Sequence, residues 1–326
     1  MDSPNWTAYN AAQVEEKSRF AELLADLCAG VPQPEQATGR PRLPLADMIF
    51  AAVYKTYVGF SARRFTTDLR DAYADGLIDS RPHFNSVNRY MANRLLTEPL
   101  KELVAVSSLP LTAVETDFVV DASGFSTGRY ERWYDKRYGR VTNRADWFKC
   151  HLVCGVQTKI VTGADVSGWT MHDGYFLPPL MERTAENFHI QEVSADKAYL
   201  SKKNMRMVDA LGGTPYIPFT SRNVEPKDDS IWAKMYHLFM YQREEFMEHY
   251  HKRSSVESAF SMLKAKFGAS VRSKSEWGQV NKVLCKVLCH NICVVIRATH
   301  ELGVEPAFGS KRTFGSETPL EPKLFI

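Results

Sequence analysis

The sequence lacks the features that define several large classes of protein. No apolar run approaches the roughly 18 residues of a membrane span, and the first residues lack the basic and then apolar pattern of a signal peptide. No repeat or low-complexity tract is present. A net charge of only +3 does not by itself indicate a nucleic-acid partner. We therefore expect a soluble, cytoplasmic protein without a membrane partner.

Cysteine is also scarce, and its six positions do not suggest a disulfide framework, because a chain of 326 residues can bury a large core. Cys285, Cys289 and Cys293 recur every four residues, which predicts a stripe along one helix. Cys150 and Cys154 share one face of a predicted strand. These spacings are not those of zinc knuckles or ribbons. We predict buried free thiols.

The N-terminal third has the periodicity of helices. We expect helices at 10–29, 45–60, 66–76 and 84–96. The last two resemble a helix-turn-helix in which 84–96 is the reading helix. In that helix Val87, Met91 and Leu95 would face inward, whereas Asn88 and Arg89 would face outward, where such side chains contact bases and phosphates. An ordinary helical domain with a polar outer face explains the pattern equally well.

From Val114 onward the pattern changes to that of strands alternating with helices. We expect strands at 114–122, 148–156, 160–166, 191–195 and 214–219, helices at 176–184 and 201–211, a helical insertion at 221–249 and a long helix at 276–301. This order fits an α/β fold, a mixed ribonuclease-H-like sheet flanked by helices and preceded by an all-α domain. The expected division is a helical DNA-binding or dimerisation domain at 1–108, a catalytic domain at 109–303 and an irregular tail at 304–326.

Two predicted strands end in an aspartate, Asp121 before a Ser-Gly turn and Asp196 after Gln191–Ala195. A carboxylate at the exit of a strand points into whatever site the next loop leaves open. Asp117 shares a strand face with Asp121, but it lies nearer the start of that strand. We therefore choose Asp121 over Asp117.

The segment 129–149 combines seven Arg or Lys with interleaved Tyr, Trp and Phe. Basic residues follow phosphates and aromatic rings stack on bases, so Arg132, Lys136, Arg137 and Arg140 are candidate DNA contacts. A twisted edge strand kept soluble by its charges is the alternative. Trp232 in the helical insertion is a further candidate for stacking on a base, although an aromatic residue at helical spacing more often packs in a core.

The pattern that organises the chain is Tyr250-x2-Arg253-x3-Glu257-x6-Lys264, which we call the Tyr-Arg-Glu-Lys signature. These steps are close to whole turns of a helix, so all four side chains would project along one face. A carboxylate flanked by cations and a phenol suits a divalent metal beside a phosphate. A solvated charged face is the simpler reading. Together with Asp121 and Asp196, Glu257 gives oxygen ligands of the kind that Mg²⁺ or Mn²⁺ prefers.

These motifs, namely Asp-Ala-Ser-Gly-Phe-Ser-Thr, Ala-Asp-Lys-Ala-Tyr and the signature, occur in the order seen in insertion-sequence DDE transposases, and the chain resembles that family over roughly 40–300. The resemblance implies a homodimer or larger assembly that binds terminal inverted repeats of double-stranded DNA, nicks them and joins the 3′ ends to a target. It further implies two Mg²⁺ ions, replaceable by Mn²⁺, at Asp121, Asp196 and Glu257, with Arg253, Lys264 and Tyr250 on DNA phosphates. The large β insertion of some relatives is not predicted here.

Two other functions agree with the same residues. A ribonuclease-H-like nuclease of repair or recombination would use the same metals without joining strands. A domesticated copy would only bind DNA and regulate. All three carboxylates are present, which favours a catalytic protein.

Overall fold

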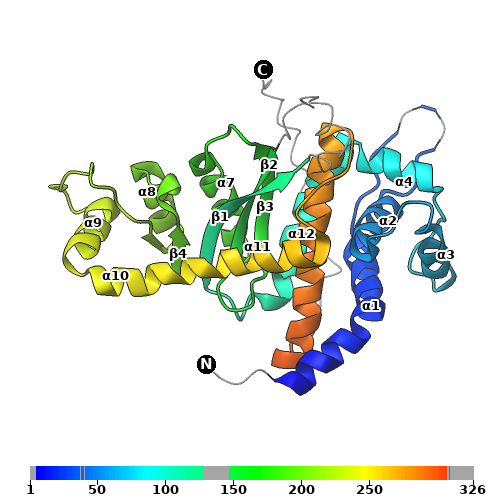
Figure 1. The fold of residues 1–326 in the computed structure, drawn as a ribbon, viewed down its shortest axis with the longest axis horizontal. Coiled ribbons are helices and arrows are strands. Elements are labelled where there is room, and N and C mark those ends of the chain that lie inside the picture. Colours follow the sequence, from blue (N-terminus) through cyan, green and yellow to red (C-terminus); the bar gives the residue numbers. More distant parts are fainter. Residues whose placement is uncertain (1–4, 37, 40, 128–146, 307, 309–326) are drawn as a thin grey trace, which may run out of the picture.

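The computed structural model describes residues 5–36, 38–39, 41–127, 147–306 and 308. The N-terminal part is helical, as predicted (Figure 1). Its elements are α1 (Trp6–Ala29), α2 (Leu45–Val58), α3 (Thr66–Ala74), α4 (Phe84–Met91), the 3₁₀ turn η1 (Arg94–Leu96), α5 (Thr97–Ser108) and the 3₁₀ turn η2 (Leu109–Leu111). Asn5 caps α1 by accepting from the backbone N–H of Ala8, and Gly59 ends α2 in the left-handed conformation that suits glycine.

The predicted helix 84–96 is wrong in its second half. α4 ends at Met91, and the side chain of Asn93 accepts a hydrogen bond from the N–H of Leu95 at 3.0 Å, which starts the separate turn η1. This restart rotates the following residues, so Leu95 is exposed and Leu96 is buried instead. Val87 and Met91 face inward as expected.

The second part of the chain alternates strands and helices in the predicted order. Its elements are β1 (Asp117–Ser126), β2 (Trp147–Gly155), β3 (Val161–Gly168), η3 (Asp173–Tyr175), α7 (Leu177–Ala185), β4 (Glu192–Ala195), η4 (Lys197–Tyr199), α8 (Lys202–Ala210), β5 (Thr214–Tyr216), α9 (Ile231–Tyr241), α10 (Arg243–Tyr250), η5 (His251–Arg253), α11 (Ser254–Phe267) and α12 (Glu276–Leu302).

The strands form one five-stranded mixed sheet in the order β3-β2-β1-β4-β5. β1 pairs antiparallel with β2 and parallel with β4, and β4 pairs parallel with β5. Its pairing with β2 carries β1 on to Ser126, so the predicted turn at Asp121–Gly124 is wrong. β4 is short, and its ladder with β1 ends at Val120↔Ala195. The distal half of β1 therefore has β2 on one edge and no β4 partner on the other.

Helices cover both faces of this sheet, which confirms the predicted fold class (Figure 1). On one face Val119, Phe125 and Leu152 pack with α11, α12 and the N-terminal helices in one continuous apolar cluster. On the other face Phe118 and Val120 pack with α7, α8 and α9. Alternate residues of β1 thus enter different cores, as the pleat of a strand requires.

The long helix α12 lies between the sheet and the N-terminal helices (Figure 1). Among the described helices it is long and apolar enough to cross a membrane, but 78% of that apolar stretch is buried within the protein. The expectation that no stretch approaches the length of a span was therefore too simple, and the burial identifies a core helix. Two buried asparagines fasten it: Asn281 donates to the carbonyl oxygens of Met91 and Asn93, and Asn291 donates to those of Val104 and Val161.

Candidate active site

Asp121 and Asp196 lie side by side where β4 ends. Their preceding residues are the last parallel pair, Val120↔Ala195, so the two aspartates follow a matched pair of neighbouring strand positions. Sites of open α/β sheets lie beyond the carboxyl ends of parallel strands, because side chains there are not covered by the next strand. Asp121 accepts a hydrogen bond at 2.8 Å from the N–H of Ala122.

The Tyr-Arg-Glu-Lys signature comes to the same place, although it does not lie on one uninterrupted α-helix. Tyr250 ends α10, Arg253 lies in the 3₁₀ turn η5, and Glu257 and Lys264 lie on α11. Nη1 of Arg253 donates to Asp121 at 2.8 Å, and its Nη2 pairs with Glu257. Nζ of Lys264 donates to the hydroxyl of Ser123 at 2.6 Å. Asp121 and Ser123 share one face of β1, and they are contacted by Arg253 and Lys264, which lie just before and on α11. The helix α11 therefore runs along this face of the strand.

The carboxylates of this site affect one another electrostatically. Burial raises the pKa of Asp121, the N–H of Ala122 and the guanidinium of Arg253 lower it, and the charges of Asp196 and Glu257 raise it. Burial alone would lower the pKa of Arg253, but the interactions with Tyr250 and then with Asp121, Glu257 and Asp196 outweigh burial and raise it. The three predicted metal ligands therefore belong to one electrostatic unit.

The set of donors fits a hard divalent cation, since it consists of carboxylate oxygens that repel one another without a cation between them. Here the cation between Asp121 and Glu257 is the guanidinium of Arg253. No group of three His, Cys, Asp or Glu side chains among the described residues is arranged to hold an ion. The three carboxylates are therefore close together, but they do not form a ready-made metal-binding site. The cysteines are free thiols, and five of the six are buried.

Asp117, the alternative to Asp121, is already paired elsewhere. It lies beside Glu192 in the ladder of β1 and β4, and Nζ of Lys252 donates to both carboxylates, at 2.8 Å and 2.7 Å. His249 lies 2.8 Å from the second oxygen of Glu192. Burial alone would raise the pKa of Glu192, but the contacts with Lys252 and His249 lower it. Lys252 is not among the residues predicted from the sequence, where its only signal is its position next to Arg253.

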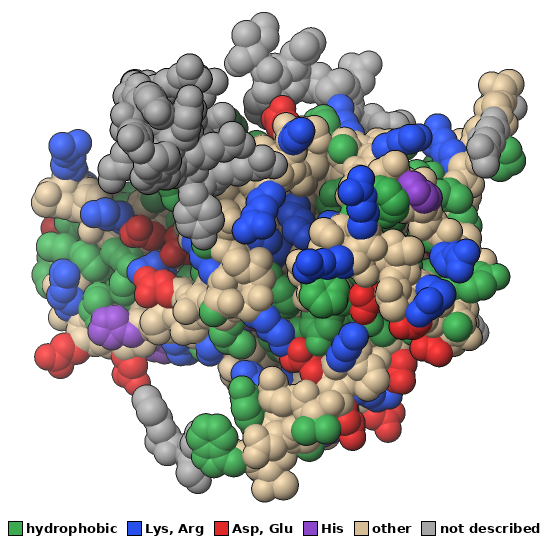
Figure 2. Space-filling view, turned by 45° about the vertical axis from the view of Figure 1, so that its right-hand side comes forward, with side chains coloured by type: hydrophobic (Ala, Val, Ile, Leu, Met, Phe, Trp, Pro, Cys, Tyr) green, Lys and Arg blue, Asp and Glu red, His purple; other side chains and the backbone are tan. Residues whose placement is uncertain are grey.

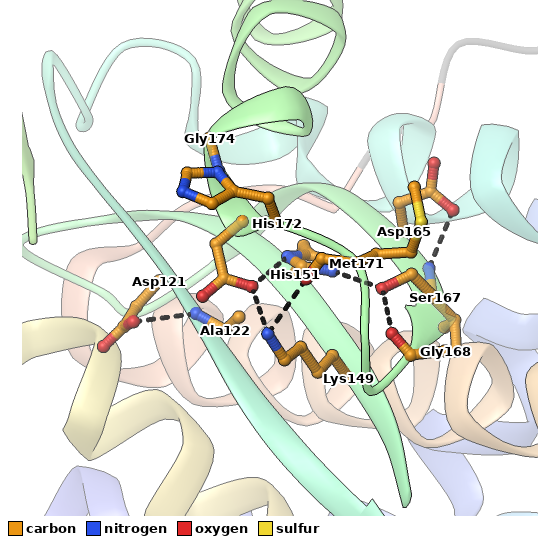
Figure 3. A network of polar contacts seen from close by, with 12 residues as sticks. Asp121, Ala122, Lys149, His151, Asp165, Ser167, Gly168, Met171, His172 and Gly174 are labelled. Carbon is orange, nitrogen blue, oxygen red and sulfur yellow. Dashed lines mark hydrogen bonds and ion pairs between the residues drawn. The ribbon is translucent and has the colours of Figure 1, made fainter. Parts of the chain in front are cut away.

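A second polar cluster, Lys149, His151 and Asp173, lies on the opposite face of β1 and β2 (Figure 3). Lys149 donates to Asp173 at 2.9 Å, and Nδ1 of His151 is 3.9 Å from the same oxygen. His151 is fully buried, its Nε2 is 2.8 Å from the hydroxyl of Ser167, and burial lowers its pKa to about 4. This cluster is not among the sites predicted from the sequence. The spacing of Lys149 and His151, two residues apart on a strand, was the available signal.

Tyr199 lies at the end of η4, the turn that directly follows Asp196. Its hydroxyl is buried and has no hydrogen-bond partner among the described residues. Its pKa is raised first by burial and then by the charges of Asp121, Asp173 and Asp196, so the phenol lies within electrostatic range of all three. Asn204 holds the surrounding turns together by donating to the carbonyl oxygens of Gly174 and Tyr199 at 3.2 Å and 2.8 Å.

The predicted DNA contacts have different outcomes. Asn88 and Arg89 are exposed on α4. Figure 2 shows several Lys and Arg side chains gathered near the middle of the face of the molecule that it presents. Trp232 is only 8% exposed and packs edge-on against Phe219, so its ring is a core group and the stacking prediction is wrong. The hydrophobic stripe of α9 turns it inward. Four basic candidates lie outside the described residues: Arg132, Lys136, Arg137 and Arg140.

Comparisons with known proteins agree with this geometry. A family model described as a transposase DDE domain matches residues 112–292, which include Asp121, Asp196 and Glu257. A curated protein of Archaeoglobus fulgidus, described as a probable transposase for insertion sequence element ISA1214, is 26% identical over 184 residues. That match covers 56% of this chain and 54% of the relative, so the chain spans about half the length of the relative. No solved structure matches.

Proposed function

Because the chain belongs to the DDE transposases of insertion sequences, we propose that it binds the terminal inverted repeats of such an element, nicks them and joins the 3′-OH ends to target DNA. The observation that carries this proposal is the meeting of two strand residues with one helix residue. Asp121 and Asp196 are neighbours on β1 and at the end of β4, and Arg253 joins Asp121 to Glu257 of α11.

In this proposal Asp121, Asp196 and Glu257 would hold two Mg²⁺ ions, for which Mn²⁺ could substitute. Such ions supply Lewis-acid stabilisation of the attacking and leaving oxygens of a phosphodiester. The protein's own contribution is to keep three carboxylates charged and close together on rigid elements. The pKa of Asp121 is raised, chiefly by burial, but the hydrogen bond from the N–H of Ala122 stabilises the charged form of this carboxylate.

Arg253 and Lys264 provide the positive charge for DNA phosphates next to the carboxylates, with Tyr250 in support. Guanidinium groups bind phosphate through two parallel hydrogen bonds, and an ammonium acts as a point charge. Lys264 is held over the ring of Phe125 at 5.2 Å and bonded to Ser123, so its position beside β1 is set by packing. Burial lowers its pKa.

We further propose that residues 1–108 bind the DNA ends and contribute to a homodimer on DNA, whereas residues 109–303 carry out catalysis. Asn88 and Arg89 support this division because they are exposed on the second helix of the predicted helix-turn-helix. The aromatic–cation pairs Arg63–Phe84 and Arg94–Trp277 add positive charge and aromatic surface near that helix.

The test is incubation of the full chain with Mg²⁺ and DNA that carries the sequences flanking its reading frame, followed by mapping of the 3′ ends. Cleavage at the repeats and joining of the new 3′-OH ends to target DNA is the expected result. Cleavage without joining would favour a nuclease, and binding without cleavage would favour a regulator. Glu257→Gln protein is the control, because it removes one ligand charge from an exposed side chain.

A further inference from the structure

The guanidinium of Arg253 occupies the position of a cation in the candidate site. One of its nitrogens donates to Asp121 at 2.8 Å, and another pairs with Glu257. Only 23% of the Arg253 side chain is exposed, as is 23% of that of Asp121, so solvent screens this ion pair incompletely. Two of the three proposed metal ligands therefore already share one positive charge, that of a side chain of the protein.

Coordination of a metal ion needs the same oxygen lone pairs that Arg253 uses. One carboxylate oxygen of Asp121 accepts a hydrogen bond from the N–H of Ala122, and the other accepts one from Arg253. Among the described residues no metal-ready group of three ligands exists in this arrangement. A divalent ion between Asp121 and Glu257 would therefore compete with Arg253 for these carboxylates, and the cost of weakening the two contacts lowers the affinity of the free protein for metal.

A DNA phosphate offers Arg253 an equivalent partner, because guanidinium binds phosphate with the same two-pronged geometry as carboxylate. Arg253 lies in the short turn η5, between α10 and α11. A phosphate at this position would draw the guanidinium away and leave Asp121 and Glu257 charged and close to each other and to Asp196. Their mutual repulsion then favours the binding of a cation.

We propose that Arg253 couples the binding of DNA to the binding of metal: it blocks the carboxylates in the free protein and releases them when it moves to a phosphate of the bound DNA. This inference rests on the proposed function, since it takes Asp121, Asp196 and Glu257 as the metal ligands. By linkage the coupling is reciprocal, so metal raises the affinity for DNA by the same factor as DNA raises the affinity for metal. The protein would thereby avoid a loaded metal centre when no DNA is present.

The test is calorimetric titration of Mn²⁺ into the full-length protein without DNA and without turnover. Arg253→Gln removes the competing charge, and we expect the affinity for Mn²⁺ to rise at least about fivefold, the lower end of usual coupling factors. Arg253→Lys keeps the charge but loses the bridging geometry and should give an intermediate rise. Circular dichroism shows whether Arg253→Gln is folded. If Arg253→Gln is unfolded, the affinity of Arg253→Lys for Mn²⁺ still tests the proposal.

Lys252→Gln is the matched control, because Lys252 is the adjacent cation but pairs with Asp117 and Glu192. It reports how much the loss of any nearby positive charge raises the affinity for Mn²⁺. If Arg253→Gln raises the affinity no more than Lys252→Gln, the proposed blocking contact is refuted. In a second titration with duplex copied from the flanking DNA, the wild-type affinity for Mn²⁺ should rise more than that of Arg253→Gln. Equal rises would also refute the coupling.

Two further variants separate this inference from the proposed function. Asp121→Asn and Glu257→Gln should each weaken the binding of Mn²⁺ in the free protein. If both bind Mn²⁺ as the wild type does, the ligand assignment and with it the proposed function fail, whatever Arg253 does. If both lose Mn²⁺ while Arg253→Gln behaves as the Lys252 control does, the ligand assignment stands and the coupling alone is wrong.

Discussion

Replacing Asp121 by asparagine tests the site with a change of one atom and one charge. The substitution keeps the size of the side chain and removes a carboxylate that would hold metal. Stabilisation by such ions amounts to several kcal/mol, and since 1.36 kcal/mol is a factor of ten, a loss of about 4 kcal/mol slows nicking about a thousandfold. We therefore expect Asp121→Asn to abolish measurable Mg²⁺-dependent nicking.

The fold should tolerate this change, because opposing effects on stability nearly cancel. The variant loses a charged hydrogen bond to Arg253, worth about 1.5–3 kcal/mol. It also relieves the burial of a charge and the repulsion from Asp196 and Glu257, the influences that raise the pKa of Asp121. The net change in the free energy of unfolding should be about 1 kcal/mol or less. Chemical denaturation measures it, and gel-shift titration should show that binding to DNA is kept.

Asp117→Asn is the matched comparison on the same strand face. Lys252 keeps its contact with Glu192 at 2.7 Å, so the positive charge remains paired and nicking should stay within a few-fold of wild type. The assay is cleavage of end-labelled DNA that carries the flanking repeats, with all three proteins at one salt concentration. If Asp121→Asn still cuts whereas Asp117→Asn does not, the assignment of Asp121 is refuted.

Three other predictions concern stability and DNA binding. Burial lowers the pKa of His151 and of His290 from 6.5 to about 4, so below pH 6.5 the unfolded chain takes up protons that the folded chain does not. The free energy of unfolding should therefore fall between pH 6.5 and 4, by up to about 3 kcal/mol for each histidine. Chemical denaturation at several pH values measures this fall, and a free energy of unfolding that stays constant over this range would contradict the prediction. Trp232→Ala should cost about 3 kcal/mol of stability, as for a core ring, and a stable variant with weakened DNA binding would contradict its burial. Arg89→Ala should leave stability unchanged and reduce the slope of log affinity against log salt by about 0.9; an unchanged slope would remove this arginine from the DNA interface.

Local patterns in the sequence were sufficient for much of the fold. The order of strands and helices from 114 to 267 follows from alternation in the strands and from apolar stripes in the helices, and both depend only on near neighbours. The strands β2 and β3 were predicted at 148–156 and 160–166, and Lys159 between them has a positive φ (69°), as in a tight turn. The helix α12 was predicted from its Val, Leu and Cys stripe.

The errors arose where distant segments decide the outcome. β1 was expected to end in a turn after Asp121, but β2 extends it to Ser126, because a ladder of hydrogen bonds overrides the local preference of Ser-Gly for a turn. Leu95 was expected to face inward, but a side-chain cap restarts the helix before it. Trp232 looked available to DNA, yet α9 turns it against Phe219.

By itself the sequence determined the types of residue in the site, their order and the spacing of the signature, because these follow from helix and strand periodicity over short distances. Only the tertiary structure decided which carboxylates meet and which cation each of them contacts. Arg253 and Asp121 are 132 residues apart in the chain, as the partners Lys252 and Asp117 are 135 apart. Contacts over such separations depend on how β4 stops short beside β1 and how α11 lies along it, and no local pattern encodes either.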